Sequence, residues 1–183
     1  GVYLYSCDAV ISNNTFENND CGSPDPPYGY GGALSMDYSE SITGWNTFNN
    51  NASSGTGGAL SLRFKDAEIH HNIFKNNYSA LGGAIGILHI DSCQHIIHNN
   101  LIYNNSCLFF GGGVSNNDAS PVWVNNTIIN NYSEGYGGGY YCKDSICPSV
   151  YNTLIWGNQC ASGWGDQVYL WDLYSQSDFY FCL

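Results

Sequence analysis

The chain has 183 residues, of which 15 are acidic and four are basic, so its formal net charge at pH 7 is −11. That balance excludes nucleic acid as a partner, because nucleic-acid binding needs clustered Lys and Arg. No apolar run approaches the roughly 20 residues of a membrane-spanning helix, so we expect no direct insertion into a membrane. Strong helix formers are scarce, whereas the abundant Asn, Gly, Tyr, Thr and Ser favour strands and turns, and the sequence predicts an all-β fold.

A repeat runs through the chain in steps of 26 to 32 residues. It begins as Asn-Thr-Phe-Glu-Asn-Asn at 14–19, and related segments begin at Asn46, Asn72, Asn100, Asn126 and Asn152. A glycine cluster such as Gly-Gly-Ala-Leu at 57–60 follows each good copy. In the first copy an insertion at 21–30, which contains three prolines, displaces this cluster. Short apolar runs separated by Gly or Asn turns predict one coil of a β-solenoid per copy.

Fixed offsets from the first Asn of each copy define the expected columns of the stack. Two apolar columns are expected to form the core: Ile11, Thr43, Ile69, Ile97, Trp123 and Ser149, and Phe16, Phe48, Phe74, Ile102, Ile128 and Leu154. The first asparagines themselves are expected to form a structural ladder: Asn14, Asn46, Asn72, Asn100, Asn126 and Asn152. Asn tolerates the left-handed conformation of a sharp turn, and its amide can bond to the equivalent amide above and below. Paired glycines allow positive φ or a close approach of backbone.

The motifs Gly-Gly-Ala-Leu/Ile and Phe-x-x-Asn, the latter at 16–19, 48–51 and 74–77, resemble the repeats of polymorphic outer-membrane proteins. They are also similar to right-handed parallel β-helix repeat proteins that bacteria export. The resemblance covers about residues 8–170 and implies a right-handed parallel β-helix of about six coils at an extracellular or cell-surface location. It implies no particular activity, because this fold serves adhesins, lyases and fibres.

We expect one domain over residues 1–183. The chain starts in a strand at 1–5 and stops in another at 178–183, and neither end carries an obvious cap. We therefore expect a segment of a longer solenoid, a subunit that stacks end to end, or a domain whose caps the sequence does not reveal.

Four charged residues are weak candidates for catalysis. A polysaccharide lyase needs a base and a cation, and Arg63 and Lys65 are expected on one strand face. A glycoside hydrolase needs two carboxylates, and Asp66 and Glu68 stand two apart on one expected strand. The alternative for the basic pair is that it only solubilises an outer face, and the two acids are compatible with a glycosidase site without being diagnostic of one.

Two further sets of side chains could bind metal ions. An acidic stripe with one member per coil could hold Ca²⁺, or could reflect only the turn preference of Asp: Glu40, Asp66, Asp91, Asp118 and Asp144. His70 and His98 share a column in adjacent coils, which predicts either a transition-metal site or a stacked surface pair. No other cofactor is expected.

The eight cysteines mostly stand too many coils apart to pair. Cys142 and Cys147, which flank a four-residue turn, are the predicted disulfide. Aromatic residues crowd the Gly-rich turns, where they could stack on sugars, contact another protein or pack between coils.

The sequence thus predicts a non-catalytic extracellular β-helix, either an adhesin stalk or a fibre subunit. Its expected partners are copies of itself, flanking coils, a polysaccharide or a cell surface. The alternative is a carbohydrate-active β-helix that binds or cleaves a polysaccharide.

Overall fold

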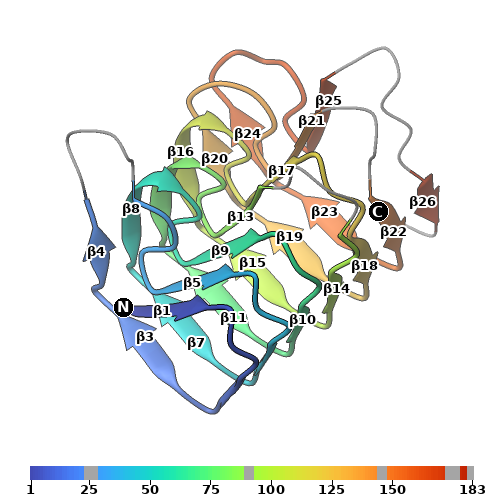
Figure 1. Ribbon diagram of the computed structural model, residues 1–183. Helices are drawn as coiled ribbons and strands as arrows, with labels where there is room; N and C mark the ends of the chain where they lie inside the picture. Colours follow the sequence, from blue (N-terminus) through green and yellow to red (C-terminus); the bar gives the residue numbers. More distant parts are fainter. Residues whose placement is uncertain (23–28, 89–92, 144–147, 172–177, 181–183) are drawn as a thin grey trace.

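The computed structural model describes residues 1–22, 29–88, 93–143, 148–171 and 178–180. Within these ranges all regular secondary structure consists of β-strands. No helix long and apolar enough to cross a membrane is found there. The coils lie side by side along one axis (Figure 1), and each full coil contributes one strand to each of four sheets.

All strand pairs within the sheets are parallel and join one coil to the next, as in β9 with β13 and β10 with β14. Sheet 1 contains β1 (Val2–Tyr5), β5 (Leu34–Asp37), β9 (Leu60–Arg63), β13 (Ile85–Leu88), β17 (Val114–Asn117), β21 (Tyr140–Lys143) and β25 (Val168–Trp171). Sheet 2 contains β2 (Val10–Ser12), β6 (Ile42–Gly44), β10 (Glu68–His70), β14 (Ile96–His98), β18 (Val122–Val124), β22 (Ser149–Tyr151) and β26 (Asp178–Tyr180).

The other two sheets have six strands each. Sheet 3 contains β3 (Thr15–Glu17), β7 (Thr47–Asn49), β11 (Ile73–Lys75), β15 (Leu101–Tyr103), β19 (Thr127–Ile129) and β23 (Leu154–Trp156). Sheet 4 contains β4 (Asp20–Cys21), β8 (Ala52–Thr56), β12 (Tyr78–Leu81), β16 (Ser106–Phe110), β20 (Tyr132–Ser133) and β24 (Gln159–Cys160). The predicted all-β parallel solenoid is confirmed.

Apolar columns fill the interior between the sheets. The rings of Phe16, Phe48 and Phe74 stack with centroids 4.9 and 4.7 Å apart, and Ile69 and Ile97 are fully buried. Such burial of aligned side chains in successive coils is what stabilises a repeat that could not fold as one coil.

In the last copy the predicted columns were wrong by one residue. Trp123 pairs with Val150 rather than Ser149, and Ile128 pairs with Ile155 rather than Leu154. The coil contains one residue more than the simple repeat allows, and a one-residue shift turns each strand residue to the opposite face.

An asparagine ladder runs between sheets 2 and 3. The Asn72 Oδ1 atom accepts a hydrogen bond from the Asn46 backbone N–H at 2.9 Å, and the Asn72 N–H bonds to Asn100 Oδ1 at the same distance. This pattern links Asn14, Asn46, Asn72, Asn100 and Asn126. The sixth position belongs to Thr153, whose Oγ1 accepts from the Asn126 N–H at 3.3 Å. The prediction of Asn152 was wrong, because Asn152 is exposed and precedes the ladder with φ 45°.

The two residues of each Asn-Asn pair have separate roles. The left-handed conformation belongs to the residue before each ladder position, as in Asn13, Asn99 and Asn125, and not to the ladder asparagine that we expected to adopt it. A second ladder, which the sequence analysis missed, runs between sheets 3 and 4 through Asn19, Asn51, Asn77, Asn105, Asn131 and Asn158. Its members are the last residues of the Phe-x-x-Asn motifs and their equivalents.

The two glycines of each pair are also required for different reasons. Gly57 has φ +73°, which an L side chain rarely adopts. A Cβ atom on the following Gly58 would lie 2.2 Å from the carbonyl oxygen of Gly83, so the second glycine allows close approach of the next coil.

Candidate functional site

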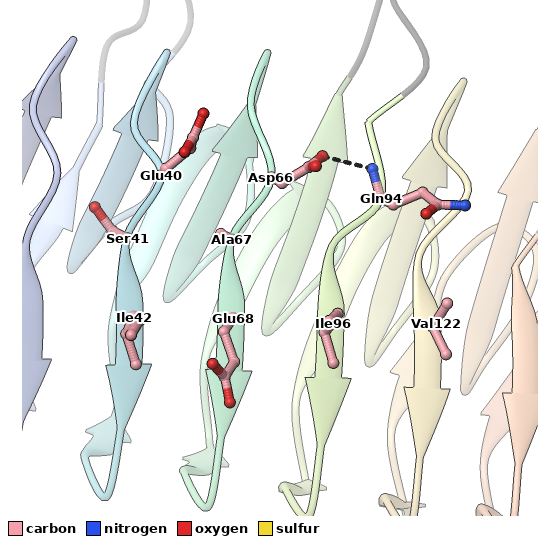
Figure 2. A pocket seen from close by; sticks show the side chains of 9 residues that line it. All are labelled: Glu40, Ser41, Ile42, Asp66, Ala67, Glu68, Gln94, Ile96 and Val122. Atoms are coloured by element: carbon pink, nitrogen blue, oxygen red, sulfur yellow. Dashed lines mark hydrogen bonds between the residues drawn. The ribbon is translucent and has the colours of Figure 1, made fainter.

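A shallow groove of about 440 Å³ crosses the outer face of sheet 2, and we call it the acidic groove. Its lining consists of Glu40, Ser41, Ile42, Asp66, Ala67, Glu68, Gln94, Ile96 and Val122. Ile42, Glu68, Ile96 and Val122 lie in register on neighbouring strands and form the row across the groove in Figure 2. The groove therefore has an apolar floor interrupted by one carboxylate.

The carboxylates around this groove bond to adjacent coils. Asp66 Oδ1 accepts a hydrogen bond from the Gln94 N–H at 2.6 Å, which is the dashed line in Figure 2. Glu40 Oε1 lies 3.1 Å from Lys65 Nζ, and the hydrogen bond to Glu40 raises the pKa of Lys65. Glu68 Oε1 lies 3.0 Å from His98 Nε2. These contacts join neighbouring coils at the surface.

A histidine cluster adjoins Glu68 on the same face. The rings of His70 and His98 stack with centroids 5.3 Å apart and planes 19° apart, and Nδ1 of His70 lies 3.1 Å from Nδ1 of His71. Gly44 leaves room for His70, because a Cβ atom there would lie 2.2 Å from the ring. The pKa of His70 is lowered, mainly because the side chain is partly buried. The neighbouring His98 and His71 lower this pKa further, whereas the charge of Glu68 raises it.

A second groove of about 450 Å³ follows the turn between sheets 2 and 3, and we call it the turn groove. It is lined by Trp45, His71, Asn72, Ile73, Asn99, Asn100, Leu101, Asn125 and Thr127. Trp45 is 59% exposed, and its ring stacks on His71 with centroids 4.2 Å apart and planes 15° apart.

The structure does not bring the expected basic pair together. Arg63 ends β9, forms an ion pair with Asp37 and lies 3.9 Å above the ring centroid of Tyr30 on the outer side of sheet 1. Phe64 then adopts φ 75°, so Lys65 is not on that strand. The expectation of a shared strand face was wrong, because a turn separates the two cations.

The two expected acids do lie near the same groove, although not on one strand. β10 begins at Glu68, and Asp66 lies in the preceding turn. Both line the acidic groove with Glu40. A catalytic role for Arg63, Lys65, Asp66 or Glu68 stays a prediction.

The acidic stripe is divided between two columns. Glu40 and Asp66 occupy equivalent positions in successive coils, and Gln94 occupies the same position in the next coil. The hydrogen bonds from Glu40 N–H to Asp8 and from Gln94 N–H to Asp66 show this equivalence. Asp118 was wrongly placed in that stripe: its N–H bonds to the Lys143 carbonyl directly after β17. Asp91 and Asp144 lie outside the described residues.

Metal binding stays a prediction for both sets. His70 and His98 are partners in the register of β10 and β14, and His71 adds a nearby imidazole. Among the residues that the structure describes, no group of three or more His, Cys, Asp or Glu could hold a metal ion.

The predicted Cys142–Cys147 pair falls partly outside the described residues, since Cys147 is not among them. Cys142 is buried in the core. Burial raises the pKa of Cys107 to about 12. This thiol belongs to a column in sheet 4 that contains Cys21, Ser53, Ser79, Cys107, Ser133 and Cys160.

Trp45 is the site residue that sequence reasoning missed. A signal was present, because three of the six copies have the first Asn of an Asn-Asn pair at the place that Trp45 occupies. A bulky residue with positive φ is uncommon and draws attention to its position.

The architecture agrees with a known family. The model of the right-handed β-helix region matches residues 1–132, which is more than half of the chain. No curated protein and no solved structure matches the sequence. Because the coils are parallel and the family model matches more than half of the sequence, we conclude that the chain belongs to the right-handed β-helix family.

Proposed function

We propose that this β-helix is a non-catalytic structural or adhesive module of an exported protein. The observation that carries the proposal is that the charged candidates bond between coils: Arg63 with Asp37, Lys65 with Glu40, and Glu68 with His98. Lyase chemistry needs a base beside a cation that neutralises the substrate's carboxylate. These three ion pairs instead connect neighbouring coils, which supports a structural role for the charged side chains.

The ladders and the parallel sheets support the same role. Neighbouring coils are joined by parallel backbone pairing and by side-chain amides, as in Asn72 with Asn100 and Asn77 with Asn105, which favours a rigid rod over a flexible chain. We place the module at the cell surface because its repeats resemble those of exported proteins. Its proposed partners are copies of itself, flanking coils, or a polysaccharide or cell surface.

A polysaccharide-degradation assay tests this proposal. The purified chain is incubated with neutral and uronate-containing polysaccharides, and the release of reducing ends and of unsaturated products is measured. We expect no release above that of a matched Asp66→Asn, Glu68→Gln variant. Products formed by the wild type and lost in the variant would favour the second candidate, a carbohydrate-active enzyme, which the shared groove of Asp66 and Glu68 supports.

The proposed function requires no cofactor. Calcium beside Glu40 and Asp66 is a subsidiary proposal, supported only by their neighbouring positions in the acidic groove. Millimolar calcium should then raise the melting temperature, and an unchanged melting curve would remove calcium from the proposal.

A further inference from the structure

We infer that the turn groove is a binding site for a neutral glycan, with the Trp45 ring as its stacking platform. This inference rests on the adhesive role proposed above and names a class of ligand for it. Sugar rings present a face of C–H groups that packs on an aromatic ring, and their hydroxyl groups bond to amides and hydroxyls. The turn groove offers both kinds of partner within one surface.

The platform is held in an unfavourable backbone conformation. Trp45 has φ 61°, at a turn where Asn13, Asn99 and Asn125 occupy the equivalent positions. Asn adopts this conformation more readily than a bulky side chain does. Burial does not compensate Trp45, which is 59% exposed, so the sequence keeps a strained and accessible indole at this point. Strain of that kind directs attention to function.

His71 fixes the orientation of the indole. The two rings are nearly parallel, with centroids 4.2 Å apart, and His71 is itself held by the 3.1 Å contact of its Nδ1 with His70. One face of the indole is therefore covered by the imidazole, and Trp45, which is still 59% exposed, lines the groove with its remaining surface. A preorganised ring loses little side-chain entropy when a ligand stacks on it.

The groove supplies polar groups without formal charge. No Asp, Glu, Lys or Arg belongs to its lining. The side-chain amide of Asn125 and the hydroxyl of Thr127 form no hydrogen bond with the residues that the structure describes. Amides and hydroxyls donate and accept hydrogen bonds as sugar hydroxyls require. A uronate or a phosphate would find no Arg or Lys here, so the chemistry favours a neutral ligand.

The turn itself is closed to an extended peptide. The backbone N–H groups of Trp45, His71 and Asn99 already bond to carbonyls of the next coil at 3.2, 3.2 and 3.0 Å. Strand addition needs free backbone groups at a sheet edge. The groove instead spans the four coils from Trp45 to Asn125, roughly 14 Å at the spacing of parallel strands, and suits a short run of sugar rings.

Calorimetric titration of the folded chain with defined oligosaccharides tests the inference. The neutral probes are cellopentaose, xylopentaose and mannopentaose, and the charged probe is pentagalacturonate. We expect at least one neutral probe to bind and Trp45→Asn to weaken that binding roughly tenfold, equivalent to about 1.4 kcal/mol. Trp45→Asn restores the residue found at equivalent turns, so the variant should fold, and circular dichroism verifies this.

Trp164→Asn is the matched control, because Trp164 is 62% exposed but lies outside the turn groove. This control should bind as the wild type does, and Asn125→Ala should bind more weakly. Absence of binding by every neutral probe, preference for pentagalacturonate, or binding unaffected by Trp45→Asn would each overturn the inference. Mass spectrometry of the recovered probe separates the two proposals: an intact sugar leaves the non-catalytic function standing, and a cleaved sugar refutes that function but not the site.

Discussion

Removal of one ladder side chain should destabilise the whole stack. Asn72 Oδ1 accepts from the backbone and side-chain N–H groups of Asn46, and Asn72 Nδ2 donates to the Thr43 carbonyl and to Asn100 Oδ1. Asn72→Ala removes these four bonds and leaves the buried Asn46 N–H without its acceptor. At about 1 kcal/mol for each bond, we expect the free energy of unfolding to fall by about 4 kcal/mol.

Two variants make this prediction specific to the ladder. Asn72→Thr should cost about half as much, about 2 kcal/mol, because Thr153 already accepts from Asn126 in the same column. Asn76→Gly should cost only a few tenths of a kcal/mol, roughly, since Asn76 is exposed, has φ 57° and loses one surface bond to Asn49.

Urea unfolding followed by far-ultraviolet circular dichroism measures all three variants. If Asn72→Ala and Asn76→Gly shifted the midpoint equally, the buried amide bonds would contribute no more to the stability of the fold than an exposed bond does. Equal loss in the Ala and Thr variants would refute the narrower claim that the acceptor oxygen is the important group.

Three further predictions concern close contact, pH and thiol chemistry. Gly58→Ala should prevent folding or lower the melting temperature severely, because its Cβ atom would lie 2.2 Å from the Gly83 oxygen; soluble expression and melting curves test this. The lowered pKa of His70 means that the unfolded chain takes up its proton first, so stability should decrease as the pH falls below the usual 6.5, and His70→Asn should reduce that decrease in urea titrations. Iodoacetamide at neutral pH should label the exposed Cys7 but not Cys107, whose pKa burial raises to about 12; peptide mass mapping would contradict this if both were labelled in the folded state.

The sequence predicted the solenoid because its period repeats the same physical requirement in every coil. Phe48 and Phe74, or Asn46 and Asn72, must meet in register, so their spacing is visible without a structure. The one-residue shift that places Thr153 in the ladder was not predicted. The last copy is degenerate and contains one added residue, so its sequence can be aligned with the other copies in two ways, and only the buried contacts select one.

The site was less predictable, because it depends on turns rather than on the period. Counting residues could not reveal that Phe64 turns the chain between Arg63 and Lys65, or that Asp118 belongs to another column than Asp66. The sequence did align His70 with His98. It did not show that Trp45 stacks on His71, since that contact depends on where two turns point their side chains.

Within each Asn-Asn pair, one residue stabilises the stack and the other presents its side chain at the surface. The second residue of each pair is bonded into the stack, while the first projects from it at the same turn, one side chain per coil at roughly 4.8 Å. Asn13, Trp45, His71 and Asn99 show that this outer position accepts different chemistries on an unchanged backbone. The molecule therefore has a row of exchangeable surface positions whose recognition properties can evolve, or be engineered, without repacking the interior.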